Sequence, residues 1–194
     1  MLASPACLAS IPWEKVHLFW VDERCVPADD VRSNFGTARK DFLSQVPIPE
    51  KNLHPVRGEF PPEKSAKDYE SELIGFFRLE EEEFPAFDLI FLGMGADGHT
   101  ASLFPGDKAL LEEKRRVLAV RGGLPTLDRI TMTRPVLNRA RRIAFLVAGR
   151  EKAQTVRAVV SGDDPSVPAG MIRPSQGELV WLLDRAAASL LEKR

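Results

Sequence analysis

Residues 87–106, FDLIFLGMGADGHTASLFPG, constrain the fold more than any other stretch of this chain. An apolar run at residues 87–92 leads directly into a loop that holds three glycines together with Asp97 and His99. Short apolar runs are typical of strands buried on both faces of a parallel sheet, and α/β proteins build ligand sites in the loops at the carboxyl ends of such strands. The stretch therefore predicts a parallel α/β protein with an enzyme site at Asp97 and His99.

The rest of the chain alternates strand-like and helix-like segments. Further strands are expected at about residues 16–21, 116–121, 128–133, 141–149 and 179–183. Helices are expected at about residues 6–11, 35–46, 62–79, 134–138, 151–160 and 185–192. Because strands and helices alternate, we predict an α/β fold with three layers (α/β/α), in which helices cover both sides of a mostly parallel sheet. No linker divides the sequence, so residues 1–194 are expected to form a single domain.

Composition excludes several classes of function. Lys and Arg together number 27 and Asp and Glu 28, so no bulk positive charge is available for a nucleic acid. No apolar run is long enough to span a bilayer, and no membrane partner is expected. The two cysteines, Cys7 and Cys25, lack metal-ligand spacing, and such sparse use suits a reducing cytoplasm. No His, Cys and carboxylate cluster has zinc spacing, so no metal site is predicted.

The loop glycines also match a dinucleotide-binding pattern. Gly93, Gly95 and Gly98 have the Gly-x-Gly-x-x-Gly spacing. However, the loop continues into His-Thr-Ala-Ser rather than into a clean helix, and no acidic residue follows at the end of the next strand. A nucleotide is therefore disfavoured, and no cofactor is predicted.

His99 is the residue best suited to general base catalysis. An imidazole accepts a proton from water near neutral pH, and Asp97 is close enough in sequence to fix its tautomer. The structural alternatives are a histidine that satisfies loop hydrogen bonds and an aspartate that forms an Asx-turn. His17, inside a strand run, is interpreted as structural, and His54, before a proline, as a loop residue.

A second group of charged residues lies near predicted strand ends. Asp22 and Arg24 follow the first strand, and because side chains alternate along a strand they share a face, with Glu23 opposite. Arg24 suits an anion such as phosphate, and the alternative is a local ion pair. Arg129 and Lys152 add positive charge, and Lys152 falls in a first helical turn, where backbone amides also favour an anion. An ordinary solvated charge is the alternative for each.

Several motifs together resemble the 6-phosphogluconolactonase family. They are VDERCVP at residues 21–27 with Ser33-Asn34, LGMGADGHTASLFPG at 92–106, RITMT at 129–133 and GREKA at 149–153. The similarity covers nearly the whole chain from Trp13, and the long central motif is its most specific part.

The resemblance implies hydrolysis of a small sugar-phosphate lactone, 6-phosphoglucono-1,5-lactone, in the oxidative pentose phosphate pathway and without a metal. It also implies a fold shared with glucosamine-6-phosphate deaminase. In this scheme His99 activates the attacking water, while Asp22 orients the histidine, the water or ring hydroxyls. The residues implied to contact the phosphate or the developing oxyanion are Arg24, Arg129, Lys152 and the loop amides from Gly95 to Gly98.

Two alternatives stay open within the same family. The related deaminase has a glutamate at the position of Phe104, where it assists the histidine, and DEY in place of DER. Phenylalanine neither relays nor accepts a proton, so hydrolysis is favoured over isomerisation and deamination. The second alternative is a non-catalytic module that binds sugar phosphates.

Members of this family normally begin with a strand and a Gly-Gly-Ser-Thr-Pro loop that binds phosphate. Nothing similar precedes Trp13. We therefore expect an N-terminally shortened member of the family, working in the cytoplasm as a monomer or a homodimer.

Overall fold

The apolar run at residues 87–92 forms a short strand, β4 (Ile90–Leu92), and the glycine-rich loop begins directly after it. The computed structural model of the protein describes residues 5–123, 125–162 and 164–191. Strand β4 pairs in parallel with β7 (Arg142–Val147), which pairs in parallel with β8 (Glu178–Leu183). The loop therefore lies at the carboxyl edge of a parallel ladder, as the sequence predicts.

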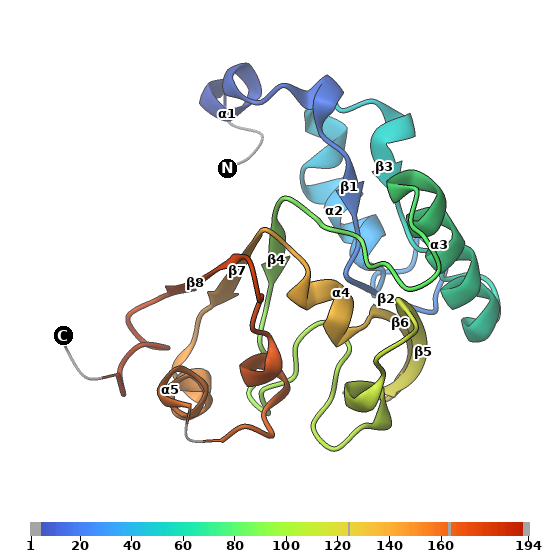
Figure 1. Cartoon of the computed structure of the whole chain (residues 1–194). Coiled ribbons are helices and arrows are strands. Elements are labelled where there is room, and N and C mark those ends of the chain that lie inside the picture. The colour runs from blue at the N-terminus through green and yellow to red at the C-terminus, as the bar shows by residue number, and fades with distance from the viewer. Residues whose placement is uncertain (1–4, 124, 163, 192–194) are drawn as a thin grey trace.

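The remaining elements are arranged around this ladder (Figure 1). The other strands are β1 (Leu18–Phe19), β2 (Asp22–Arg24), β3 (Leu53–His54), β5 (Val117–Gly122) and β6 (Leu127–Met132). The helices are α1 (Pro5–Ser10), α2 (Asn34–Asp41), α3 (Pro62–Phe77), α4 (Arg134–Asn138) and α5 (Ala153–Ser161). Short 3₁₀ turns connect several of them, among them Arg150–Lys152 just before α5.

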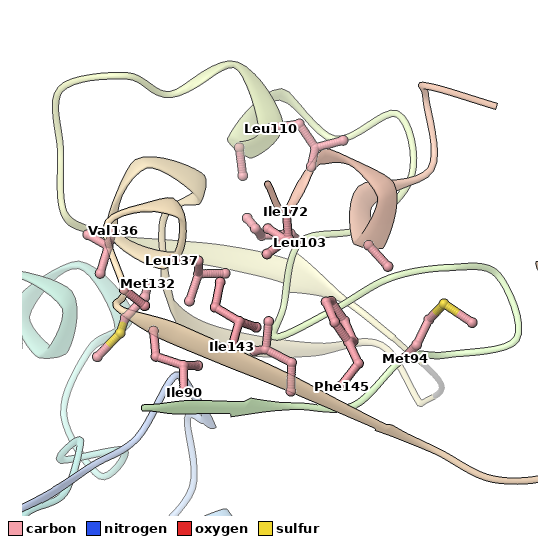
Figure 2. Close-up of a cluster of buried hydrophobic side chains, with 14 of the residues drawn as sticks. Ile90, Met94, Leu103, Leu110, Met132, Val136, Leu137, Ile143, Phe145 and Ile172 are labelled. Carbon is pink, nitrogen blue, oxygen red and sulfur yellow. The ribbon is translucent and has the colours of Figure 1, made fainter. Parts of the chain in front are cut away.

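One face of the β4–β7–β8 ladder forms the main hydrophobic core. The register aligns Leu92 with Phe145 and Phe145 with Trp181, and the rings of the last two stack with centroids 4.1 Å apart. Figure 2 shows Ile90, Ile143 and Phe145 pointing to the same side of their strands, into the cluster that contains Leu103. This burial anchors the strand that precedes the loop.

The opposite face of the same ladder is less covered. Phe91, Leu146 and Leu182 alternate with the core residues and are 55%, 50% and 52% exposed. The sequence predicts helices on both faces, and the described part of the chain leaves these three side chains half open to solvent.

A second ladder, β2–β6–β5, is antiparallel, which differs from the mostly parallel sheet expected. Only residues 123–126 separate β5 from β6, and so short a connection can join antiparallel strands but not parallel ones. The register places Arg24 directly opposite Arg129. This ladder thus brings together two candidate residues that are far apart in sequence.

The strand expected at residues 16–21 is interrupted at Trp20. The hydroxyl of Tyr69, on α3, donates to the Trp20 carbonyl and accepts from the Trp20 amide, each over 2.9 Å. These bonds replace the ladder partners that Trp20 would need in a strand. The chain therefore divides into β1, which pairs in parallel with β3, and β2, which carries Asp22 into the second ladder.

Two expected helices differ from the structure. The helix expected at residues 35–46 ends at Asp41 and is followed by a 3₁₀ turn. The helix expected at 185–192 is wrong for residues 185–191, which form turns, and Glu192 lies outside the described residues. The Asp184 carboxylate does accept from the Ala187 amide as a cap would, but so short a segment does not sustain a helix without tertiary packing. The single-domain organisation stays a prediction.

Candidate active site

The loop after β4 is closed by its own hydrogen bonds. The Gly95 amide donates to the His99 carbonyl over 2.9 Å, and the Gly98 amide donates to the Gly95 carbonyl over 3.0 Å. The Thr100 hydroxyl donates to the Gly93 carbonyl over 2.8 Å. Gly98 has a φ of 82°, a conformation that favours glycine. The amides of Gly95 and Gly98 were expected to face developing charge, but the loop itself engages both of them, so these glycines shape the loop.

His99 and Asp97 form a direct pair inside this loop. Nδ1 of His99 lies 2.6 Å from Oδ1 of Asp97, and the same oxygen accepts from the His99 amide over 3.1 Å. Gly95 makes room for this pair, because a Cβ there would lie 2.2 Å from Nδ1 of His99 and 2.5 Å from the Asp97 carboxylate. The side chain of His99 is 33% exposed, so one edge of the ring reaches solvent.

The protonation of Asp97 decides which nitrogen of His99 can act as a base. Burial raises the pKa of Asp97, but the hydrogen bonds from the His99 amide and imidazole and the charge of His99 outweigh it, and the pKa falls below its ordinary value. An ionised carboxylate only accepts, so Nδ1 carries the proton. In neutral His99 the free lone pair is then on Nε2, which is the arrangement that a general base requires.

Asp22 is held by other residues than His99. One carboxylate oxygen accepts from the Ser102 hydroxyl over 2.7 Å, and the other accepts from the Asn34 amide group over 3.2 Å. Nη1 of Arg129 lies 4.0 Å from the oxygen bonded to Ser102. The orientation of the histidine therefore falls to Asp97, and Asp22 links the loop of His99 to the guanidinium of Arg129.

Two arginines lie opposite one another in this region. Arg24 and Arg129 are directly opposed across β2 and β6, and like charges so placed repel. Burial, and next the charge of Arg24, lower the pKa of Arg129, while Asp22 and Glu23 raise it. Nε of Arg24 is buried and has no partner within the described ranges, although Nη1 donates to the Arg32 carbonyl over 2.6 Å. An anion would relieve the repulsion and satisfy donors that are already desolvated.

Phe104 contacts both the histidine and the guanidinium of Arg129. Its ring centroid is 5.0 Å from that of His99, at an interplanar angle of 42°. The guanidinium carbon of Arg129 is 5.6 Å from the same centroid. One apolar ring therefore contacts both groups. It occupies the position at which the family resemblance implies a glutamate in the related deaminase.

Lys152 reaches the same region through the packing of α5. It ends the 3₁₀ turn before α5, and Thr155, in the first turn of that helix, donates to the Ala96 carbonyl over 2.7 Å. The Lys152 side chain makes no hydrogen bond or ion pair with another residue in the described part of the chain. Lys152 thus directly precedes the helix that bonds to the loop of His99, and within the described residues it makes no polar contact with His99, Asp22 or Arg129.

The other two histidines form a separate cluster. His17 Nδ1 lies 3.0 Å from His54 Nε2, and His54 Nδ1 lies 2.7 Å from the carboxylate of Glu72. Both rings also pack on Phe76 of α3. The bond to His54 agrees with the interpretation of His17 as structural, whereas His54 lies in β3 and not in the loop expected for it.

Sequence reasoning missed the side chains that support the site. Ser102 and Asn34 were noted only as members of motifs that resemble the family, yet both bond to Asp22. Their presence in segments that resemble the family, residues 92–106 for Ser102 and the Ser33-Asn34 pair for Asn34, was the available signal. Within residues 5–123, 125–162 and 164–191, no group of three His, Cys, Asp or Glu residues could hold a metal ion. No helix of that part is long and apolar enough to cross a membrane.

Two adjoining cavities lie away from this site. One, of about 530 Å³, and another, of about 340 Å³, share Ala86, Arg139 and Arg141 in their walls. These residues precede β4 and β7, so the cavities are at the amino ends of the strands, opposite the loop of His99. Ligand sites of α/β sheets lie at the carboxyl ends, and the residues at that edge define the candidate site.

The fold and the site define an α/β enzyme in which one aromatic ring contacts both a histidine paired with an aspartate and a buried arginine. The chain belongs to the family of glucosamine-6-phosphate isomerases/6-phosphogluconolactonase, whose model matches residues 1–181. This confirms the resemblance given by the sequence motifs.

Individual relatives agree with this assignment. The chain is 47% identical over 185 residues to a 6-phosphogluconolactonase of Synechocystis sp., a match that covers 94% of this chain and 76% of that protein. The structure of 6-phosphogluconolactonase from Thermotoga maritima matches with a TM-score of 0.80 and 31% identity, over 92% of this chain and 78% of that one. A monomeric glucosamine-6-phosphate deaminase matches with a TM-score of 0.71 at 23% identity, over 88% and 73%. The last likeness is one of fold alone, and it confirms the predicted α/β class.

Proposed function

We infer that the protein hydrolyses 6-phospho-D-glucono-1,5-lactone to 6-phospho-D-gluconate, a step of the oxidative pentose phosphate pathway. The relatives supply the substrate, since proteins that carry the name 6-phosphogluconolactonase match most of this chain. The observation that carries the chemistry is the 2.6 Å contact of His99 Nδ1 with Asp97, because it leaves Nε2 as the base.

In the proposed reaction, Nε2 of His99 takes a proton from a water molecule as its oxygen attacks the lactone carbonyl. A tetrahedral oxyanion forms, and its collapse breaks the bond between the carbonyl carbon and the ring oxygen. The proton held by His99 then passes to the departing ring oxygen, which becomes a hydroxyl. Asp97 stabilises the imidazolium while the proton is held.

The cationic side chains are proposed to bind the anionic parts of the substrate. Arg24 and Arg129 already lie opposite one another, and a phosphate or an oxyanion between them would replace their repulsion with two charge-assisted contacts. Lys152 is proposed to join them from the start of α5 once a ligand is present. Asp22 is proposed to orient a substrate hydroxyl or the water, since its carboxylate is fixed by Ser102 and Asn34.

A deaminase reaction has less support. Phe104 packs against His99, and its apolar ring can neither donate nor accept a proton in the reaction. Release of ammonia from glucosamine-6-phosphate would contradict this interpretation.

The direct test is a continuous assay with freshly generated 6-phosphogluconolactone, corrected for spontaneous hydrolysis. His99→Ala should lower kcat by roughly 100- to 10,000-fold, the usual contribution of general base catalysis. The matched control is His17→Ala, which removes a histidine outside the site and should keep the wild-type rate. Full activity in His99→Ala would refute the assigned role. Binding of 6-phosphogluconate without turnover by the wild type would instead indicate the non-catalytic module.

The cellular location and the assembly stay predictions. A cytoplasmic location is proposed on the sparse use of cysteine in the sequence, and assembly as a monomer or a homodimer is a proposal beside it.

A further inference from the structure

Glu23 is a buried carboxylate placed between two candidate site residues. Its residue is 1% exposed, although Asp22 and Arg24 on either side face the site. A buried carboxylate without hydrogen-bond partners would destabilise the fold. The hydrogen bonds of Glu23 therefore indicate which segments it positions. All of them lead to the start of α2 or to the neighbouring backbone.

Each oxygen of Glu23 accepts two hydrogen bonds. One accepts from the amides of Arg24 and Asn34, over 2.8 and 2.7 Å. The other accepts from the Phe35 amide over 2.8 Å and from the Ser33 hydroxyl over 3.0 Å. The first backbone amides of α2 thus donate to the Glu23 carboxylate of strand β2, which lies at the positive end of the helix dipole.

Helix capping alone does not account for this arrangement. Ser33 already provides an N-cap, because its hydroxyl accepts from the Gly36 amide over 3.0 Å. The additional effect of Glu23 is to fix Asn34, whose side-chain amide group donates to the Asp22 carbonyl over 2.9 Å and to the Asp22 carboxylate over 3.2 Å. Asn34 is therefore bonded at its backbone to Glu23 and at its side chain to Asp22.

We propose that Glu23 is a positioning residue for the lactonase reaction, holding the Asp22 carboxylate in place through the first turn of α2 and the side chain of Asn34. Ser102 fixes the other carboxylate oxygen from the His99 loop, so Asp22 is clamped between two segments. The inference deepens the proposed function and rests on it for its kinetic test.

A double-mutant cycle on kcat tests the link between Glu23 and Asn34. Glu23→Gln and Asn34→Ala should each lower kcat by about 10-fold, since small misplacements of a positioned group have effects of this order. The double variant should lose about 10-fold as well, rather than about 100-fold, because both changes break the same chain of bonds. If the losses of kcat in the two single variants multiply in the double variant, Glu23 does not act through Asn34 and the proposal is wrong.

Stability measurements separate positioning from folding. Lys40→Gly is the matched control, since glycine at this exposed position weakens α2 without removing a partner of Glu23, Asn34 or Asp22. It should lower Tm while kcat stays at the wild-type value, whereas Asn34→Ala should lower kcat and change Tm little. If Lys40→Gly lowers kcat as much as Asn34→Ala does, helix stability alone explains the effect and the proposal is wrong.

A readout without turnover distinguishes failure of this proposal from failure of the proposed function. Hydrogen exchange of the Asn34 side-chain amide, followed by NMR, should be slow in the wild type and at least about 10-fold faster in Glu23→Gln. A wild type without lactonase activity would refute the function, while the exchange rates still decide the link. If Glu23→Gln leaves the exchange rate unchanged, the link between Glu23 and Asn34 is rejected. If Glu23→Gln does not fold, Asn34→Ala decides instead, and a wild-type kcat in that variant rejects the link.

Discussion

The ring of Phe104 lies against the imidazole of His99, with centroids 5.0 Å apart and an interplanar angle of 42°. The same ring lies 5.6 Å from the guanidinium carbon of Arg129. An aromatic face attracts a cation, so this contact keeps the guanidinium on Phe104 and away from the imidazole. The separation matters because a positive charge beside His99 would oppose the imidazolium that the reaction forms.

Replacement of this ring should therefore impair catalysis. Phe104→Leu removes the aromatic face, and we expect kcat/KM to fall by roughly 10-fold, since two groups lose a positioning contact. Phe84→Leu is the matched control, because Phe84 also packs against a guanidinium, that of Arg116 at 5.8 Å, but contacts neither His99 nor Arg129. Steady-state kinetics of both variants decide the matter, and equal losses would contradict a specific role for Phe104.

The sequence predicts the loop and its strand well because the signal is local. Apolar residues followed by closely spaced glycines report their own burial and backbone, and the structure places Asp97 and His99 in contact as expected. Their catalytic roles stay predictions. The prediction of a final helix at residues 185–192 was wrong for residues 185–191, because a local capping pattern cannot reveal whether tertiary packing will support a short helix.

Contacts between distant residues were beyond such reasoning. Arg24 lies opposite Arg129 only through an antiparallel ladder, and the sequence pattern predicted a mostly parallel sheet without indicating which strands would be antiparallel. The alternation rule correctly set Glu23 opposite Asp22 and Arg24, yet its partners at the start of α2 depend on how the following loop folds back. The sequence shows which side chains of a strand share a face. It does not show which distant segment packs against that face, because this depends on the tertiary structure.

Gly95 should be essential for a steric reason. A Cβ at this position would lie 2.2 Å from His99 Nδ1, and the ring would have to leave Asp97. Gly95→Ala should lower kcat by at least about 100-fold, since the base loses its orientation. Gly93→Ala is the control in the same loop, because a Cβ there meets nothing within 4 Å. Kinetic parity between the two variants would show that crowding of His99 is unimportant.

The Asp97 carboxylate should contribute to stability in a pH-dependent way. Its pKa in the folded protein lies below the ordinary value of 3.8, since its hydrogen bonds to His99 and the charge of His99 outweigh burial. A lowered folded-state pKa means that the stabilisation is present above the unfolded value and is lost as pH falls through the folded value. The difference in unfolding free energy between wild type and Asp97→Asn should therefore shrink below about pH 4. Urea titrations between neutral pH and pH 3 measure it, and a difference that grows as pH falls would contradict the assignment.

Arg129 should govern affinity for the anionic substrate. Its guanidinium side chain is only 9% exposed and faces Arg24 across the ladder, so a bound phosphate or carboxylate-like oxyanion would gain contacts that solvent screens weakly. Arg129→Gln keeps a donor for the Gly122 carbonyl, which Nε reaches over 3.1 Å, but removes the charge. We expect KM for the lactone to rise by roughly 10- to 100-fold, the usual effect of losing a charge-assisted contact.

The matched control for this change is Arg121→Gln on the adjacent strand β5. Arg121 is 69% exposed and pairs with Asp128 over 3.0 Å, so its replacement removes the same charge from the protein without touching the site. KM should stay at the wild-type value in this variant. Thermal shifts with inorganic phosphate provide a second measurement: phosphate should raise Tm in the wild type and in Arg121→Gln, and less in Arg129→Gln. Equal phosphate shifts in all three proteins would place the anion site elsewhere than at Arg24 and Arg129.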